Sequence, residues 1–455
     1  MTLQRRLVAA FGAGALAPIV TVIVQLINVP VMLRCWGAHL YGEWLMISAI
    51  PAYLLLTDLG FGNVAGSDMT MRVHAGDNEG AIETFQSITA LVLSASVMLG
   101  ALLSAAIFLL PVHRLLSLSS MSTKETQVAL LFLCANCLVV LQWNYINAGY
   151  RSAGRYSTAL LIVNAVRILE GISFLVLLVW HAGPVQLSIL MLGISILGTC
   201  WLLYVKHLLV PWLPLGIQHA KLARIRELTL PAVAHMAFPA GNALSLQGMT
   251  MMAGIVLGPS AVAVFNPMRT LSRTVSQLTD AVRISALVEL SAVYGQKNWD
   301  LARKLHRSAC QASLLLALMT SAALAISGPW IFTHWTHGRV IMNVPAFYTL
   351  LLVVLWNSVW NVSSAVPLAA NRHQQIAIMY LICTSLSLFF AYPLALHFGI
   401  RGLGTALLLC EAMMCFYVIR RSNKMLSDRW PAFAASMMDT TQLRALCAKS
   451  TRRLV

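Results

Sequence analysis

Four ionisable residues and a serine recur on one face of an apolar segment at residues 261–292. They are Arg269, Arg273, Ser276, Asp280 and Arg283. Successive residues of an α-helix turn by about 100°, which places all five within an arc of roughly 80°. The planar guanidinium of arginine matches two oxygens of a phosphate at once. The spacing therefore predicts an anion-binding helix face of Arg269, Arg273, Arg283 and Ser276, with Asp280 as a coupling or gating group.

The same pattern fits two less specific arrangements. The segment could lie flat in the membrane interface, or Asp280 could simply neutralise Arg283 three residues away. A flat segment would make the number of membrane crossings odd and would remove the charge asymmetry of the second half of the chain. We therefore expect the segment to cross the membrane with its basic face toward a polar pathway.

Other ionisable residues interrupt apolar segments elsewhere. Arg167 and Glu170 have the spacing of an ion pair on one helix face, and Asp58 lies near the end of the second apolar segment. We take these three as further coupling or gating candidates. Glu43, near the outer end of the same segment, is expected to be hydrated, and the pattern assigns no role to Glu411.

The sequence has no constellation typical of an enzyme or of a metal centre. His334 and His337 lack carboxylate or thiol neighbours, and Cys134 and Cys137 lie in an apolar segment without a second pair that would complete a zinc site. Phosphate-binding glycine loops, ATPase signatures and nucleophile–base pairs are also missing. We predict a protein that is not an enzyme and that holds no metal or cofactor.

Composition places the chain in a membrane. Hydrophobic residues make up 59% of it and charged residues only 10%, with a mean hydropathy of +0.76, whereas soluble proteins carry about 25% charged residues. Twelve segments are long enough to cross, and the first continues beyond the point where a signal peptide would be cleaved. The predicted spans are 8–33, 40–62, 82–110, 128–149, 157–180, 185–205, 229–257, 261–292, 308–332, 345–369, 375–397 and 402–420.

The basic residues orient these spans. With the N-terminus in the cytoplasm, 22 of the 31 lysines and arginines fall on the cytoplasmic side and only five on the outer side. Cytoplasmic loops are enriched in lysine and arginine. We therefore expect both termini in the cytoplasm. The formal net charge of +16 then reflects orientation rather than nucleic-acid binding.

The two halves resemble each other at an offset of about 220 residues. Pro18 aligns with Pro239, Gly37 with Gly258, and Gly76-Asp77 with Gly295-Gln296. Six spans per repeat place both halves in the same orientation, as in transporters built from two bundles. The sequence thus predicts an all-α polytopic protein with two pseudo-symmetric six-helix bundles around a central cavity, and Pro18 and Pro239 as hinge candidates.

The repeat also sets the expected domain limits. An N-terminal bundle covers residues 1–210 and a C-terminal bundle covers residues 229–421. A basic cytoplasmic linker joins them at 211–228, and a basic cytoplasmic tail follows at 422–455, suited to anionic lipid headgroups.

Three short elements carry a family resemblance: Tyr41-Gly42-Glu43-Trp44-Leu45, Asp58-Leu59-Gly60-Phe61-Gly62, and Gly76-Asp77. With the pattern of spans, they make the chain similar to flippases of the Wzx type, in the multidrug/oligosaccharidyl-lipid/polysaccharide transporter superfamily. The resemblance implies a MATE-like fold in the bacterial inner membrane. It also implies translocation of an undecaprenyl-diphosphate-linked oligosaccharide to the outer leaflet for O-antigen, capsule or exopolysaccharide assembly, beside polymerase and chain-length proteins.

One departure narrows the expected substrate. The related peptidoglycan-precursor flippases carry arginines deep in the first two helices. Here the first predicted span has none before Arg34, and the second has none. The peptidoglycan precursor is therefore not the expected cargo.

Two alternatives come from other functional classes. A MATE-type antiporter for cationic drugs calls for carboxylates in the first and seventh spans, and residues 8–33 and 229–257 contain no Asp or Glu. A glycan polymerase or ligase would need a large outer domain, and the predicted outer loops are short. For a flippase, moving one negative charge outward gains about 2.3 kcal/mol per 100 mV, so H⁺, Na⁺ or the membrane potential could each drive the cycle.

Overall fold

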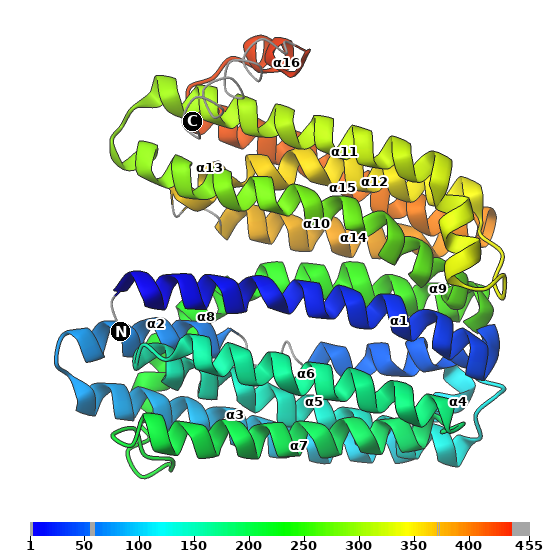
Figure 1. The fold of residues 1–455 in the computed structure, drawn as a ribbon, viewed down its shortest axis with the longest axis horizontal. Helices are drawn as coiled ribbons and strands as arrows, with labels where there is room; N and C mark the ends of the chain where they lie inside the picture. Colours follow the sequence, from blue (N-terminus) through cyan, green and yellow to red (C-terminus); the bar gives the residue numbers. More distant parts are fainter. Residues whose placement is uncertain (1–2, 55–59, 371, 373, 439–455) are drawn as a thin grey trace. The chain divides into compact units, whose positions relative to one another are not determined.

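A computed structural model describes residues 3–54, 60–370, 372 and 374–438, without the side chains of 3–22, 230, 231, 233–235 and 438. Every regular element in these residues is a helix (Figure 1). The protein is a multi-pass integral membrane protein, and its chain forms two compact units. The first comprises the chain to Ala243 with Gly258–Val262, and the second comprises Leu244–Leu257 with the chain from Ala263 onward.

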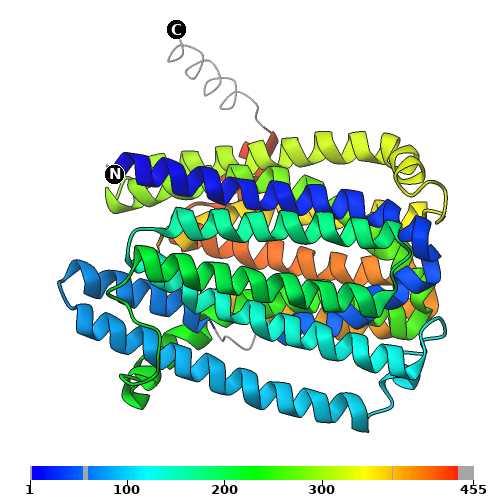
Figure 2. The same ribbon diagram turned by 60° about the horizontal axis from the view of Figure 1, so that its bottom comes forward.

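The first unit is an all-helical bundle. In it α5 packs against α2, α3 and α7, and α6 packs against α1 and α7; both views show α3, α5 and α7 running alongside one another (Figures 1 and 2). α8 packs on α2 and α3, so the contacts assign it to this unit although residues 229–243 were expected in the C-terminal bundle. Its elements are α1 (Leu3–Ala52), α2 (Phe61–His74), α3 (Asn78–Leu109), α4 (Val112–Leu115), α5 (Thr123–Ser152), α6 (Tyr156–Val179), α7 (Pro184–Leu209) and α8 (Leu222–Ala243).

The second unit is built in the same way around α12 and α15, which pack against each other and against α11 and α14. It opens with a short π-helix that continues α8. Its elements are η2 (Leu244–Gly248), α9 (Met249–Leu257), α10 (Pro259–Gly295), α11 (Trp299–Trp335), α12 (Val344–Ser363), α13 (Ala365–Ala369), α14 (Gln374–Phe398), α15 (Ile400–Met425) and α16 (Trp430–Met438).

Nine helices in the described residues are long and apolar enough to cross a membrane, so the predicted count of twelve is not confirmed. The predicted spans 40–62, 229–257 and 261–292 have no separate counterpart among the nine. The second predicted span is divided between the end of α1 and α2, and the seventh is divided among α8, the π-helix and α9. The eighth lies in α10, whose charged residues lower its hydropathy.

The expected internal repeat is visible in the backbone. Positive φ angles recur 221 positions apart at Gly37 and Gly258 (74° and 87°), at Gly76 and Lys297 (82° and 55°), and at Ser117 and Gly338 (51° and 68°). Gly37 bends α1 sharply (Figure 1), because its left-handed φ suits a residue without a Cβ. At these three pairs of positions, the two halves therefore have the same left-handed backbone conformation.

The helix caps extend this repeat and correct one predicted alignment. Asp77 and Asn298, 221 positions apart, each accept a hydrogen bond from the backbone N–H three residues later, at 2.8 and 3.2 Å. Gly76-Asp77 therefore corresponds to Lys297-Asn298 rather than to Gly295-Gln296. The physical reason is that a left-handed residue followed by an N-cap is the unit that repeats.

Glu43 holds one end of the first unit together. Its side chain is 0% exposed, and its carboxylate accepts backbone N–H bonds from Ser119, Ser120 and Met121 at 2.6, 2.8 and 3.1 Å. The His39 ring lies 3.2 Å away. The expectation that Glu43 is hydrated is therefore wrong, because the turn before α5 folds over the carboxylate and supplies donors in place of water.

We expect Glu43→Gln to lower the thermal stability of the protein in detergent by about 2 kcal/mol. An amide offers one acceptor oxygen in place of two and adds a donor that faces other donors. The melting midpoint of purified protein measures the effect. Glu79→Gln, an exposed glutamate on α3, is the matched control and should melt like the parent. Equal midpoints for parent and Glu43→Gln would show that the hydrogen bonds of the carboxylate to the turn before α5 do not stabilise the protein.

The opposite end of the unit is closed by a polar network. Arg72 donates to Asp68 and Asp77 at 2.9 and 2.7 Å, and Thr84 donates to Asp68 at 2.7 Å. The Gly80 backbone N–H, together with Arg72, lowers the pKa of Asp77 below its usual range. Because the pKa of Asp77 is lowered in the folded state, ionised Asp77 stabilises the fold at neutral pH. This stabilisation is lost as the pH falls through the lowered pKa of Asp77. The Gly76-Asp77 element thus joins α2 to α3.

Candidate functional site

The basic face of α10 divides into three arginines with different surroundings. Arg269 is half-buried, and its guanidinium donates to the carbonyls of Ser245 and Leu246 at 3.3 and 3.0 Å. It also donates to Thr250 and Asn266, at 3.0 and 2.9 Å. Ser245 and Leu246 belong to the π-helix Leu244–Gly248, a form whose wider turn is usually found at functional sites. Arg269 therefore braces this π-helix with its donors.

Arg273, one turn further along α10, is exposed. Within the described part of the chain it forms no hydrogen bond and no ion pair within 4.0 Å. Its five N–H donors are therefore available to a ligand. An unneutralised arginine on a membrane helix is costly and typically marks a transport pathway.

Arg283 is neutralised within its own helix. Its Nε donates to Asp280 at 3.0 Å, and Asn361 of α12 donates to the same carboxylate oxygen at 2.8 Å. Asp280 therefore neutralises Arg283, which is the less specific arrangement considered from the sequence. Ser276 lies half-buried on the same helix face. Of the three predicted anion-binding arginines, Arg273 is thus the one whose guanidinium has no hydrogen bond in the described part of the chain.

A buried carboxylate adjoins this region. Glu411 of α15 is 6% exposed and accepts hydrogen bonds from Trp360 and Asn357 of α12, at 2.5 and 3.0 Å. Since Asn361 reaches Asp280, side chains of α12 contact both Glu411 and Asp280. Sequence reasoning left Glu411 without a role. The signal was the pair Asn357 and Asn361, one helical turn apart in an apolar segment.

The first unit contains a separate cavity of mixed polarity, about 460 Å³, between α1, α6 and α7. Amide, hydroxyl, charged, aromatic and aliphatic side chains share its lining, and the lining residue Asn28 has a buried amide oxygen without a hydrogen-bond partner among the described residues. The cavity was not foreseen, because its residues are far apart in sequence. It is lined by Val24, Gln25, Asn28, Met32, Trp44, Ser48, Arg167, Glu170, Gly171, Phe174 and Met191.

Arg167 and Glu170 both reach this cavity, but they are not joined in the predicted ion pair. Arg167 is exposed and Glu170 half-buried, and no contact within 4.0 Å between them is found in the described residues. Both charges can therefore face a ligand. Trp44 is buried against Phe174 with 6.2 Å between ring centroids, which makes one wall of the cavity aromatic.

The remaining predicted residues are less informative. Asp58 lies outside the described residues. Pro18 lies in α1, where its side chain is not described, and Pro239 is exposed in α8 five residues before the π-helix. The hinge roles of both prolines stay predictions.

Comparison with known proteins identifies the fold. No protein-family model matches the sequence, and no curated protein is similar to it. Solved structures do match. An inward-facing multidrug resistance MATE family transporter of the MOP superfamily gives a TM-score of 0.74 at 15% identity, covering 89% of this chain and 94% of that one.

Two further structures agree. An outward-facing MATE family transporter of the same superfamily gives 0.59 at 16% identity, covering 90% and 93% of the two chains. A MOP superfamily transporter from Pyrococcus furiosus, described as having a binding pocket of reverse polarity, gives 0.58 at 16% identity, covering 93% and 94%. The fold is therefore MATE-like, as the sequence predicted.

Proposed function

We propose that this protein is a transporter that moves an undecaprenyl-diphosphate-linked oligosaccharide from the cytoplasmic to the outer leaflet by alternating access. The observation that carries the proposal is Arg273, whose guanidinium has no hydrogen bond or ion pair within the described residues of an apolar helix. A diphosphate provides several anionic oxygens in the geometry that a guanidinium binds with paired hydrogen bonds. A cationic drug would be repelled by the same group.

The cavity of the first unit suits the glycan part of this substrate. Sugars are bound by amide and hydroxyl groups beside aromatic rings, and Gln25, Asn28, Ser48 and Trp44 supply them. A volume of about 460 Å³ lies in the range of small-molecule sites. It would hold only part of an oligosaccharide, so we infer that it contacts a limited number of sugar units.

The orientation belongs to the same proposal. The two ends of α3 mark the two ends of the first unit. Glu83, near the start of α3, pairs with Lys221. The last residues of α3 lead into the turn whose backbone N–H groups donate to Glu43. Most basic residues of the first unit belong to the Lys221 end. We place this end, and both termini, in the cytoplasm of a bacterial inner membrane, where the membrane potential favours outward movement of an anion.

A second candidate is a MATE-type antiporter for cationic drugs. The observation that favours it is Glu170, a carboxylate that lines the cavity without an ion pair among the described residues and would attract a cation. Arg167 in the same cavity opposes it. The two functions therefore differ in the charge of the molecule that they carry.

Deletion of the gene distinguishes them. We expect loss of surface polysaccharide and accumulation of lipid-linked oligosaccharide in the cytoplasmic leaflet, with both restored by the parent gene. The same cultures are tested for growth in cationic drugs. Increased drug sensitivity with unchanged surface polysaccharide would reject the flippase in favour of the antiporter.

A further inference from the structure

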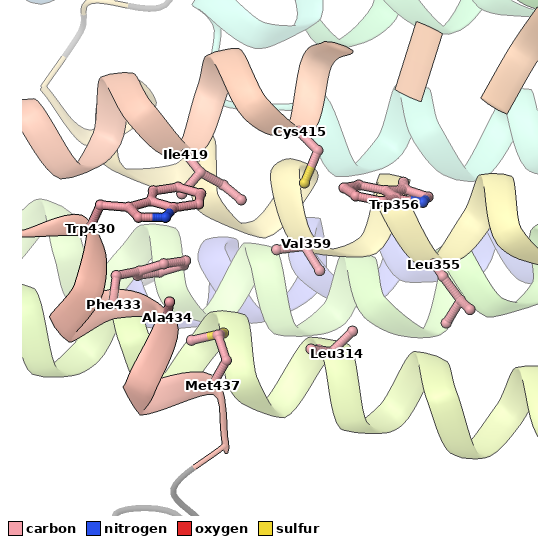
Figure 3. Close-up of a pocket in the computed structure, with 10 residues that line it drawn as sticks. All are labelled: Leu314, Leu355, Trp356, Val359, Cys415, Ile419, Trp430, Phe433, Ala434 and Met437. Carbon is pink, nitrogen blue, oxygen red and sulfur yellow. The ribbon is translucent and has the colours of Figure 1, made fainter. Parts of the chain in front are cut away.

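An apolar groove of about 330 Å³ lies in the second unit, between α16 and the helices α11, α12 and α15. Figure 3 shows Trp430 and Trp356 at its two ends, with Cys415, Val359 and Ile419 between them. None of the described residues that line it is charged. The other lining residues are Leu314, Leu355, Phe433, Ala434 and Met437.

The helix that covers the groove is held firmly in place. Phe433 is 3% exposed and stacks on His306 of α11, with 5.3 Å between ring centroids. Just before α16, Asp428 pairs with Arg307, and Arg303 donates to the Ser427 carbonyl at 3.3 Å. The groove is therefore a built feature of the unit and does not depend on a loosely attached helix.

The depth of the groove indicates its occupant. Cys415 lies ten residues before the end of α15, and Trp356 seven before the end of α12, which corresponds to about 10–15 Å at 1.5 Å per residue. The groove thus reaches from the helix ends into the hydrocarbon region. An extended peptide there would leave backbone groups without hydrogen bonds, whereas an acyl chain has none to satisfy. Trp356 is 45% exposed and Trp430 50%, so the groove is open to such a chain.

Basic residues lie near the ends of the helices that bound the groove, and Arg429 immediately precedes the lining residue Trp430. Arg420, Lys424 and Arg429 are exposed and form no ion pair in the described part of the chain. The nearby Asp428 is already neutralised by Arg307. Unpaired cations at the membrane surface attract anionic lipids.

We propose that this groove binds one acyl chain of an anionic phospholipid, whose phosphate is held by Arg429 beside the groove-lining Trp430. The site is independent of the transported molecule. Lipid binding can therefore be tested without a transport assay.

Native mass spectrometry of the purified full chain tests the proposal, with phosphatidylglycerol and phosphatidylcholine of identical acyl chains as probes. We expect the parent to prefer phosphatidylglycerol. The variant Arg429→Gln should bind it about fivefold more weakly, with phosphatidylcholine unchanged. Ala434→Trp, which fills the groove, should weaken binding of both lipids.

Arg401→Gln, at the other end of α15, is the matched control and should bind like the parent. Melting midpoints of each variant without added lipid establish that it is folded. Equal affinity of the parent for the two lipids would overturn the headgroup site. Unchanged lipid binding by folded Ala434→Trp would overturn the groove as the place of the acyl chain.

Discussion

Replacing Arg273 with lysine is expected to reduce glycan export by about tenfold to a hundredfold while the protein folds normally. Lysine keeps the positive charge, so attraction of an anion at a distance is retained. It cannot hold two phosphate oxygens in the fixed geometry of a guanidinium, and the loss of a charged hydrogen bond of about 1.5–3 kcal/mol accounts for that range of rates. Surface polysaccharide in cells that express equal amounts of protein measures the effect.

The matched control is Arg401→Lys, an exposed arginine of α15, which should export like the parent. Arg273→Gln should be at least as impaired as Arg273→Lys, because it loses both charge and geometry. If Arg273→Lys exported glycan at the parental rate, the guanidinium would act only as a diffuse positive charge. The idea of a diphosphate seat on α10 would then fail.

The second large effect is expected at Arg269, and it is an effect on folding. Arg269→Ala removes the donors that satisfy the Ser245 and Leu246 carbonyls and the side chains of Thr250 and Asn266. Unsatisfied acceptors in the membrane cost free energy, and we expect a loss of about 2–4 kcal/mol in stability. The melting midpoint of purified protein and its resistance to trypsin should both fall.

Arg273→Ala is the internal comparison, since it lies one turn away on the same helix. It should melt like the parent, because Arg273 has no hydrogen bond in the described structure, and it should fail to export. We thus expect Arg269→Ala to lower stability and Arg273→Ala to lower transport. Equal melting midpoints for Arg269→Ala and the parent would refute the brace.

Much of the fold could be predicted from local properties of the sequence. Long apolar segments predict membrane helices because the bilayer leaves backbone groups no partner outside the helix. Gly37 and Gly258 mark equivalent turns because a left-handed φ suits a residue without a Cβ. Arg269, Arg273, Asp280 and Arg283 share a face because helix periodicity depends only on spacing along the chain.

The roles within that face were decided by tertiary structure. Arg269 is tied to carbonyls 23 and 24 residues earlier, and Asp280 meets Asn361 81 residues later. Glu43 and Glu411 likewise find their donors more than 50 residues away. A charge pattern along one helix cannot show which groups will be satisfied by other helices. Packing alone left Arg273 unpartnered in the described chain, and that physical difference separates the proposed binding group from the residue that braces the π-helix.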